Sequence, residues 1–244
     1  MIEKAIVNTG TTVVLLFKIV NSKINIMEEI VKIISVEPVT HDVKHYRVEK
    51  PKGYKFQPGQ ATEVAINQEK WKDEKRPFTF TSLNEWPHLE FTIKSYRDHN
   101  GVTNDLDHLQ PGDELIIHDV WGAIAYNGPG YFIAGGAGIT PFIAIFRQLY
   151  KDNMIDDNEL FFSNKTSADI IMKDEFEKIL GDKAHFILTQ EGNKKEYIDK
   201  AFLQKHIKDF SKPFYICGPD KMVEVISNIL QESGAKPEAL VFEK

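Results

Sequence analysis

The chain has almost no cysteine. Its 244 residues include one, Cys217. A single cysteine excludes an intramolecular disulfide, and it excludes any iron–sulfur cluster or four-cysteine zinc site built within this chain. Any iron–sulfur group that works with this protein must therefore belong to another protein. So little cysteine is typical of a reducing environment, and we expect a cytoplasmic location.

Long apolar runs are also lacking. The most apolar stretch, TTVVLLFKIV (11–20), is interrupted by Lys18 and is shorter than the roughly 20 residues that a membrane helix needs. Its flanks do not fit a signal peptide either. We therefore predict no integral membrane segment, and we expect residues 1–26 to be an appended strand or helix of uncertain role.

The chain has no excess of basic residues, because 30 Lys and Arg against 36 Asp and Glu give a net charge of −6. This balance offers no bulk attraction for nucleic acid. The eight histidines show no metal-ligand or catalytic-triad spacing, so we predict no metal site. We expect His99, His108 and His118 at the surface or in turns.

What the chain does contain divides into two halves with different periodicities. Residues 27–127 carry short β-branched and aromatic runs separated by turn clusters such as QPGQ (57–60), which predicts an antiparallel barrel or sandwich. A short helix is expected at 102–109, capped by Thr103 or Asn104. In residues 128–244, strand-like and helical segments alternate, which predicts a doubly wound α/β domain with a parallel sheet.

The first strand of the α/β half ends in a glycine cluster, GGAGITPF (135–142). Ligands bind at the carboxyl edge of such a sheet, and a helix N-terminus there suits a pyrophosphate. A glycine-rich turn is also needed for tight packing in many α/β proteins. The cluster alone is compatible with either role.

Two further stretches point toward the same ligand chemistry. CGPDKM (217–222) ends a later strand of the same sheet and either leaves an open floor for a flat ring or is a buried cysteine before a turn. RPFTFTS (76–82) lies in the barrel half. Its arginine, aromatics and hydroxyls suit a phosphate-bearing heterocycle, or else it is an edge strand with a surface arginine.

Taken together and in this order, these stretches resemble the ferredoxin–NADP⁺ reductase-like flavoproteins, in the bacterial flavodoxin/ferredoxin reductase and oxygenase-reductase branches without a fused ferredoxin domain. The resemblance spans about residues 28–244. It rests on R-x-[YF]-[ST] at 76–79, G-x-[ST]-x-x-L at 101–106, G-G-x-G-I-T-P at 135–141 and C-G-P at 217–219. It implies a barrel that binds flavin, followed by an α/β domain that binds NAD(P).

The resemblance also implies roles for individual residues. Arg76 would hold the flavin phosphate or pyrophosphate, Phe78 would pack against the isoalloxazine ring, and Thr79 would form a hydrogen bond near flavin N5. Phe242 is the candidate for an aromatic that shields the flavin. The remaining implied contacts are Pro77, Ile93, Lys94, Gly101, Val102 and Thr103 for the flavin, and Gly136, Gly138, Ile139, Thr140, Lys165, Cys217, Gly218 and Pro219 for the nucleotide.

The implied reaction is hydride transfer from NADPH or NADH to bound flavin, with Thr79 and Cys217 at the reacting rings. Two phosphate-binding stretches favour FAD over FMN. Electrons would leave to ferredoxin or flavodoxin, docked near the flavin edge through lysines such as Lys44, Lys70, Lys72 and Lys75. The alternatives are a reductase component of an oxygenase, a free-flavin reductase, and a non-catalytic flavin-binding electron-transfer subunit.

Overall fold

The computed structural model describes residues 3–9, 12–18, 28–97, 101–122, 124–192 and 195–242. Strands β1 (Glu3–Thr9) and β2 (Thr12–Lys18) pair with each other in an antiparallel hairpin, which is a separate two-stranded sheet. The other parts of residues 1–26, for which we expected a strand or helix, lie outside the described residues. No helix in the described ranges is long and apolar enough to cross a membrane.

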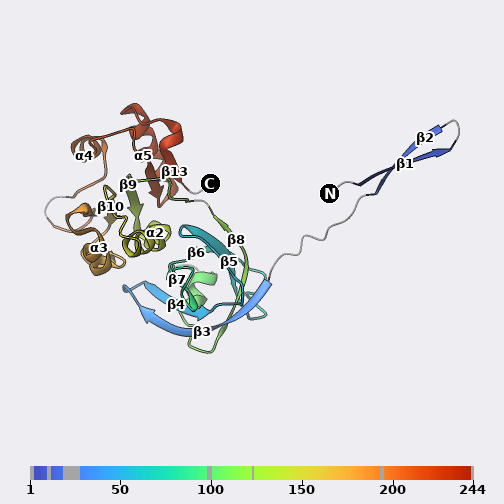
Figure 1. The fold of residues 1–244 in the computed structure, drawn as a ribbon. Helices are drawn as coiled ribbons and strands as arrows, with labels where there is room; N and C mark the ends of the chain where they lie inside the picture. Colours follow the sequence, from blue (N-terminus) through green and yellow to red (C-terminus); the bar gives the residue numbers. More distant parts are fainter. Residues whose placement is uncertain are drawn as a thin grey trace.

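The barrel half is a six-stranded antiparallel sheet in the order β6-β5-β8-β3-β4-β7 (Figure 1). Its edge strands β6 and β7 meet through a single bridge between Phe80 and Phe91, which closes the sheet on itself. The short runs in the sequence correspond to these strands: β3 (Glu28–Pro38), β4 (Val43–Glu49), β5 (Gln60–Ile66), β6 (Arg76–Thr79), β7 (His88–Lys94) and β8 (Glu114–Gly122).

The barrel core is aliphatic and aromatic, with Tyr46, Phe80 and Phe91 completely buried. Helix α1 (Val102–Leu106) packs Val102 and Leu106 into this core. Its predicted cap at Thr103 or Asn104 is wrong: Gly101 is the N-cap, and its carbonyl accepts from the Asn104 backbone N–H at 3.0 Å.

The α/β half is a five-stranded parallel sheet in the order β11-β10-β9-β12-β13, and the predicted two-part fold class is confirmed. The chain alternates between strands and helices as the periodicity predicts. The elements are β9 (Tyr131–Gly135), α2 (Thr140–Lys151), β10 (Glu159–Asn164), α3 (Lys173–Leu180), β11 (Ala184–Leu188), α4 (Lys200–His206), β12 (Phe214–Cys217), α5 (Asp220–Glu232) and β13 (Leu240–Phe242).

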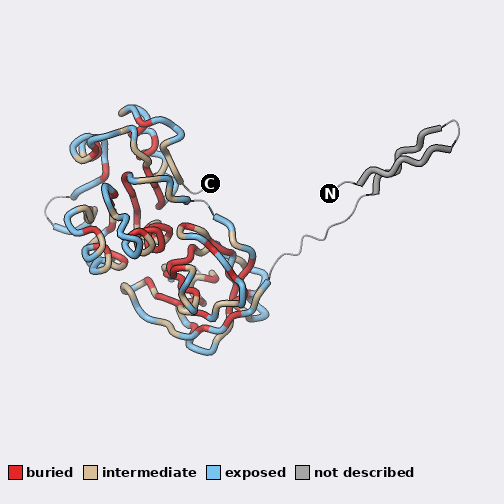
Figure 2. Tube along the Cα trace, in the orientation of Figure 1, coloured by how far each residue is buried: buried red, intermediate tan, exposed pale blue. Residues whose placement is uncertain are grey.

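The central strands β9 and β12 are buried along their whole length and β10 along most of its length (Figure 2). Side chains of β9 alternate between the two faces of the sheet: Phe132 packs in the cluster with α2 and α3, whereas Tyr131 packs with α4 and α5. The cluster that contains Phe132, α2 and α3 also includes Val43 and Ile124 from the barrel half. The helix that follows the glycine cluster is therefore also the helix on which the barrel rests.

Candidate active site between the two sheets

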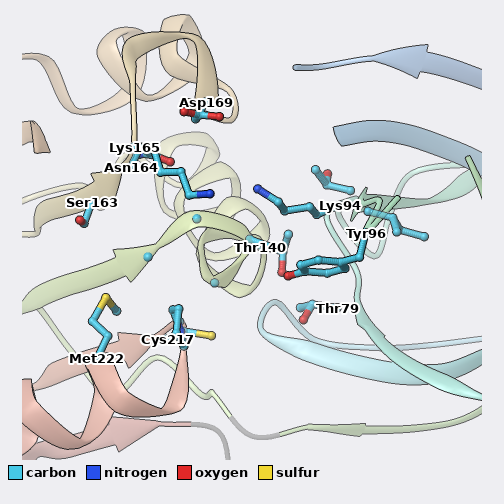
Figure 3. A pocket seen from close by; sticks show the side chains of 18 of the residues that line it. Thr79, Lys94, Tyr96, Thr140, Ser163, Asn164, Lys165, Asp169, Cys217 and Met222 are labelled. Atoms are coloured by element: carbon cyan, nitrogen blue, oxygen red, sulfur yellow. The ribbon is translucent and has the colours of Figure 1, made fainter. Parts of the chain in front are cut away.

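A cavity of about 700 Å³ opens between the two halves and takes its walls from both (Figure 3). On the α/β side it lies at the carboxyl ends of β9 and β12, which are neighbours in the sheet although β9 leads on to β10 and β12 to β13. The strand order therefore reverses between these two strands. Ligands bind at such a switch point because the flanking loops diverge there and leave a crevice.

The glycine cluster serves two purposes. A Cβ on Gly135 would lie 2.6 Å from the Met222 sulfur, and a Cβ on Gly138 would lie 2.4 Å from the Cys217 carbonyl oxygen. Gly136 has a φ of +52° and open space where its Cβ would be. Two of the glycines thus let the turn pack against β12 and its loop, whereas Gly136 is the one of the three with free space at its Cβ position.

The helical turn after the cluster aims backbone N–H groups at the cavity. A 3₁₀ turn (Gly136–Ile139) runs directly into α2, and Pro141 occupies the first helical turn, where the missing N–H costs nothing. Gly136, Gly138 and Thr140 line the cavity, whereas Ile139 is fully buried beneath them. The partial positive charge of this helix end favours an anionic group.

The floor of the α/β wall is formed by the end of β12. Cys217, Gly218 and Pro219 line the cavity together with Met222 of α5. Cys217 itself is largely buried, with 8% of the residue exposed. A small sulfur, a glycine and a proline leave a flat apolar surface beside the anion-binding helix end, which suits a ring joined to a phosphate.

The barrel wall is built from β6 and β7. Pro77, Phe78 and Thr79 line the cavity, and Phe78 also packs against the barrel core. From β7 come Ile93 and Lys94, whose pairing with Lys44 and Val43 of β4 fixes their height along the wall. Aromatic and hydroxyl groups therefore face the Cys217 surface across the cavity.

The two walls each bring a lysine to the cavity, and Figure 3 shows the ammonium groups of Lys94 and Lys165 pointing toward each other. Lys94 is 2.9 Å from the Asp42 carboxylate, on its own half. Asp169 lies on the α/β wall, where it accepts hydrogen bonds from the Thr166 hydroxyl at 2.7 Å and backbone N–H at 2.8 Å. Burial alone would raise the pKa of Asp169, but these bonds outweigh it and keep the pKa below its usual range.

Five of the residues predicted for the site do not line this cavity. Val102 and Ile139 are core residues, and Gly101 is the cap of α1. Arg76 is exposed and bonds to Glu74 and to the Lys75 carbonyl. Phe242 pairs with Ile216 in the sheet and lines a separate cavity against α5. The other thirteen residues, from both halves of the chain, are brought together.

Three of the four lysines expected at a docking surface are paired with carboxylates. Lys44 bonds to Asp107, Lys70 to Asp105 and Lys72 to Glu69. The expectation for His118 is wrong, because this residue is only 3% exposed in β8, whereas His108 is exposed. His99 lies outside the described residues. No group of three or more metal-ligating side chains occurs in the described part of the chain.

The sequence motifs did not point to several cavity residues. Tyr96 is half-exposed and its ring extends into the cavity from the loop after β7 (Figure 3). Its position two residues beyond Lys94 was the only available signal. Thr92, Asp169 and Thr189 also line the walls. Thr92 and Thr189 stand outside the short motifs, on a strand and a loop that the fold alone brings to the cavity.

The cavity fits a flavin together with a nicotinamide nucleotide. Gly136 leaves open space at a helix N-terminus for a pyrophosphate, Lys94 and Lys165 supply positive charge, and Phe78 and the Gly218–Pro219 surface supply two apolar walls. Two ring systems in contact need such opposed surfaces.

Comparison with known families agrees with this division of the cavity. Residues 30–126 match the family model of the oxidoreductase FAD-binding domain, and residues 132–228 match that of the oxidoreductase NAD-binding domain. The two matches together cover most of the chain. The first contains the β6 and β7 wall, and the second contains the glycine cluster and Cys217.

Curated relatives include oxidoreductases of several kinds. NADH-cytochrome b5 reductase 2 of Mycosarcoma maydis is 28% identical over 83% of this chain and 65% of its own length. The ferredoxin–NAD(P)⁺ reductase component of the naphthalene 1,2-dioxygenase system of Pseudomonas putida is 23% identical over 84% of this chain and 65% of its own length. The chain therefore spans slightly less than two thirds of these relatives.

Solved structures share the fold. A ferredoxin NADP⁺ reductase from Neisseria gonorrhoeae with bound FAD and NADP superimposes with a TM-score of 0.76 at 19% identity, over 88% of this chain and 98% of that one. The CS-b5R domains of human Ncb5or in the NAD⁺ form give a TM-score of 0.76 at 24% identity, over 92% of this chain and 71% of that one.

Proposed function

Since the chain belongs to the family of oxidoreductases that join an FAD-binding domain to an NAD-binding domain in the ferredoxin–NADP⁺ reductase fold, we propose that it is an NAD(P)H-dependent flavoprotein reductase that passes electrons to an external protein acceptor. The observation that carries this proposal is the cavity that takes one wall from each domain. Bound FAD would supply the chemistry that accepts a hydride and releases single electrons.

On the barrel wall, Phe78 and Thr79 would hold the flavin ring, with the Thr79 hydroxyl directed at its edge. Arg76 would turn from Glu74 to the flavin phosphates. The present Arg76–Glu74 contact is 3.4 Å long between side chains that are 46% and 54% exposed. An ion pair this exposed contributes little stability, so it does not oppose that movement.

On the α/β wall, the Gly136–Thr140 turn would bind the nucleotide pyrophosphate. Cys217, Gly218 and Pro219 would support the nicotinamide ring opposite Thr79. Hydride transfer needs the reacting atoms at about 3–3.5 Å in a fixed orientation. The task of this chain is therefore to hold two rings against each other and to exclude water, and no acid–base pair is needed.

The nucleotide is NADH or NADPH, and the residues placed to distinguish them are those that end β10. Ser163, Asn164 and Lys165 line the cavity, and Lys165 is the cationic member of the group. A 2′-phosphate requires such a cationic partner, whereas a 2′-hydroxyl does not.

A one-electron carrier is the proposed acceptor, of which ferredoxin and flavodoxin are examples. Support comes from the Pseudomonas putida relative, whose name is that of a ferredoxin reductase component. One cysteine within these 244 residues is too few to hold an iron–sulfur cluster, which supports an acceptor outside this sequence. The low cysteine content also supports a reducing, cytoplasmic setting.

The test is anaerobic mixing of the purified, FAD-loaded protein with NADH and with NADPH separately, while flavin absorbance is followed. We expect rapid bleaching with at least one nucleotide. A yellow protein that neither nucleotide bleaches would contradict the reductase function and leave a passive flavin-binding subunit. A protein that takes up neither FAD nor FMN would contradict the flavin site itself.

A further inference from the structure

The two domains are joined by a buried ionic contact outside the cavity. Arg147, on α2, is 2.7 Å from the Glu90 carboxylate of β7, and it also donates to the Thr81 carbonyl at 2.6 Å. On its own domain Arg147 makes two hydrogen bonds to Glu175 of α3, at 2.6 and 2.9 Å. One guanidinium thus holds a strand of the barrel and two helices of the α/β domain.

This contact is screened from water, unlike the exposed Lys151–Glu85 pair across the same boundary. The side chains of Arg147 and Glu90 are 11% and 2% exposed. Burial alone would raise the pKa of Glu90, but Arg147 and His45 outweigh burial and lower it, so the carboxylate stays charged. Removing one partner of a buried pair leaves an uncompensated buried charge, which is strongly destabilising.

A series of close polar contacts leads from this ion pair to the cavity wall. The Thr81 hydroxyl donates to Glu90 Oε1 at 3.1 Å and lies 3.2 Å from the Thr92 hydroxyl, and Thr92 lines the cavity. Thr92 is also 2.8 Å from His45 Nδ1, and His45 Nε2 is 2.9 Å from the Met172 sulfur, just before α3. The same network therefore crosses the domain boundary twice.

The elements that meet at Arg147 are those that carry the two cavity walls. Helix α2 begins at the nucleotide turn, and Arg147 lies seven residues beyond Thr140, roughly 10 Å along the helix at 1.5 Å per residue. Strand β7 carries Glu90 two residues before Thr92, so the two side chains lie on the same face of the strand. A displacement of α2 against β7 would move the nucleotide wall directly against the flavin wall.

We propose that Arg147 is a positioning residue for hydride transfer: by holding Glu90, it sets the separation of the nucleotide-binding and flavin-binding walls of the cavity. The inference rests on the proposed function and adds to it a residue that touches neither ligand. Arg147 does not line the cavity, and so its effect must pass through the relative placement of α2 and β7.

The test compares Arg147→Lys, Arg147→Met and Glu90→Gln with Lys151→Met. Lys151 is the matched control. It lies one turn further along α2 and bridges to Glu85 across the same boundary, but its side chain is 51% exposed. In each FAD-loaded variant, the rate constant of flavin reduction at saturating nucleotide is measured under anaerobic single-turnover conditions, together with nucleotide affinity and the thermal midpoint.

We expect the Arg147 and Glu90 variants to lose roughly 10- to 100-fold in the reduction rate constant, which is the cost of a displacement of about 1 Å, with a much smaller change in nucleotide affinity. Arg147→Lys keeps the charge but loses the two-pronged geometry, so we expect it to fall between Arg147→Met and wild type. Lys151→Met should match wild type. A purely stabilising role would instead lower the thermal midpoint and leave the rate constant unchanged, which would overturn the inference.

A second readout does not depend on catalysis. Backbone hydrogen exchange of the ligand-free protein is followed at residues 92–94 and 136–140, and we expect faster exchange at both in Arg147→Lys and Glu90→Gln and at neither in Lys151→Met. If wild type is not bleached by either nucleotide, the proposed function fails while the exchange result still tests the coupling of the walls. Unchanged exchange at both segments would overturn that coupling.

Discussion

Gly138 lies directly against the backbone of Cys217: a Cβ on Gly138 would be 2.4 Å from the Cys217 carbonyl oxygen and 2.5 Å from the Gly218 nitrogen. Both neighbours are backbone atoms of a buried strand end, so neither gives way cheaply. The close approach of these two loops is what brings the anion-binding turn beside the Cys217 surface.

We therefore expect Gly138→Ala to lower the free energy of unfolding by about 1–3 kcal/mol, the usual cost of overpacking, and to weaken nucleotide binding as the loops separate. Denaturant unfolding and nucleotide titration measure the two effects. Wild-type nucleotide affinity in Gly138→Ala would show that the loop contact does not shape the site.

Arg76→Gln tests whether this exposed arginine reaches the flavin phosphates. The exposed contact with Glu74 contributes little stability, so we expect the thermal midpoint of the flavin-free protein to stay unchanged. A charged hydrogen bond to phosphate is worth about 1.5–3 kcal/mol, and we expect FAD affinity to fall by roughly tenfold or more. Equilibrium dialysis against FAD gives the affinity. Equal FAD affinity in the variant would remove Arg76 from the flavin site.

Lys165→Met tests the choice of nucleotide. Lys165 is the cation at the end of β10 on the cavity wall, so its loss should weaken NADPH binding by about tenfold, the cost of one charged hydrogen bond to the 2′-phosphate. NADH binding should change much less. The ratio of the two affinities is the measurement, and Lys183→Met, whose amine bonds to the Asp156 carbonyl, is the control. Parallel loss for both nucleotides would place Lys165 at the shared pyrophosphate instead.

The His45 network predicts a loss of stability in mild acid. Burial lowers the pKa of His45 below 6.5, with Glu90 and Glu175 opposing and Arg147 and Arg47 adding to the effect. The neutral ring fits its contacts, because the Met172 sulfur only accepts, so Nε2 donates to it and Nδ1 accepts from Thr92.

The sign follows from the protons bound in each state. Below about pH 6.5 the unfolded chain takes up a proton at His45 that the folded protein does not, so stability falls with pH until the lowered pKa is reached. Glu90 titrates at lower pH still, below 4.5. We expect the thermal midpoint to decrease as the pH is lowered from about 7.5 to about 5.5. This decrease should be smaller in His45→Gln than in wild type, and the same as wild type in His108→Gln. Equal slopes in all three would contradict this assignment.

The sequence predicted the two-part fold well because each half has its own periodicity, and each strand run became a strand. For the same reason the local pattern indicated that Thr79 and Cys217 lie at a sheet edge: each is the last residue of a regular strand, β6 or β12, and both line the cavity.

Contacts between distant segments could not be predicted. The partners of Gly135 and Gly138 lie in the β12–α5 region, some 80 residues away, so the cluster alone did not reveal that two of its glycines serve packing. In the sequence, Arg147 occupies what reads as a polar position of an amphipathic helix, and no nearby residue indicates that Glu90 is its partner. Thr103 lies at a plausible cap position, but Val102 packs into the barrel core, so the helix begins at Val102 with Gly101 as its N-cap.

The position of α2 limits how this protein can be recombined. A hybrid that joined this barrel to the α/β domain of a relative, cut in the loop near residue 128, would keep both binding motifs intact. It would nevertheless seat a foreign helix on Val43, Ile124 and Glu90. A hybrid of this kind, made to change the nucleotide preference or the acceptor, would therefore need the residues at positions 90 and 147 to come from the same parent protein.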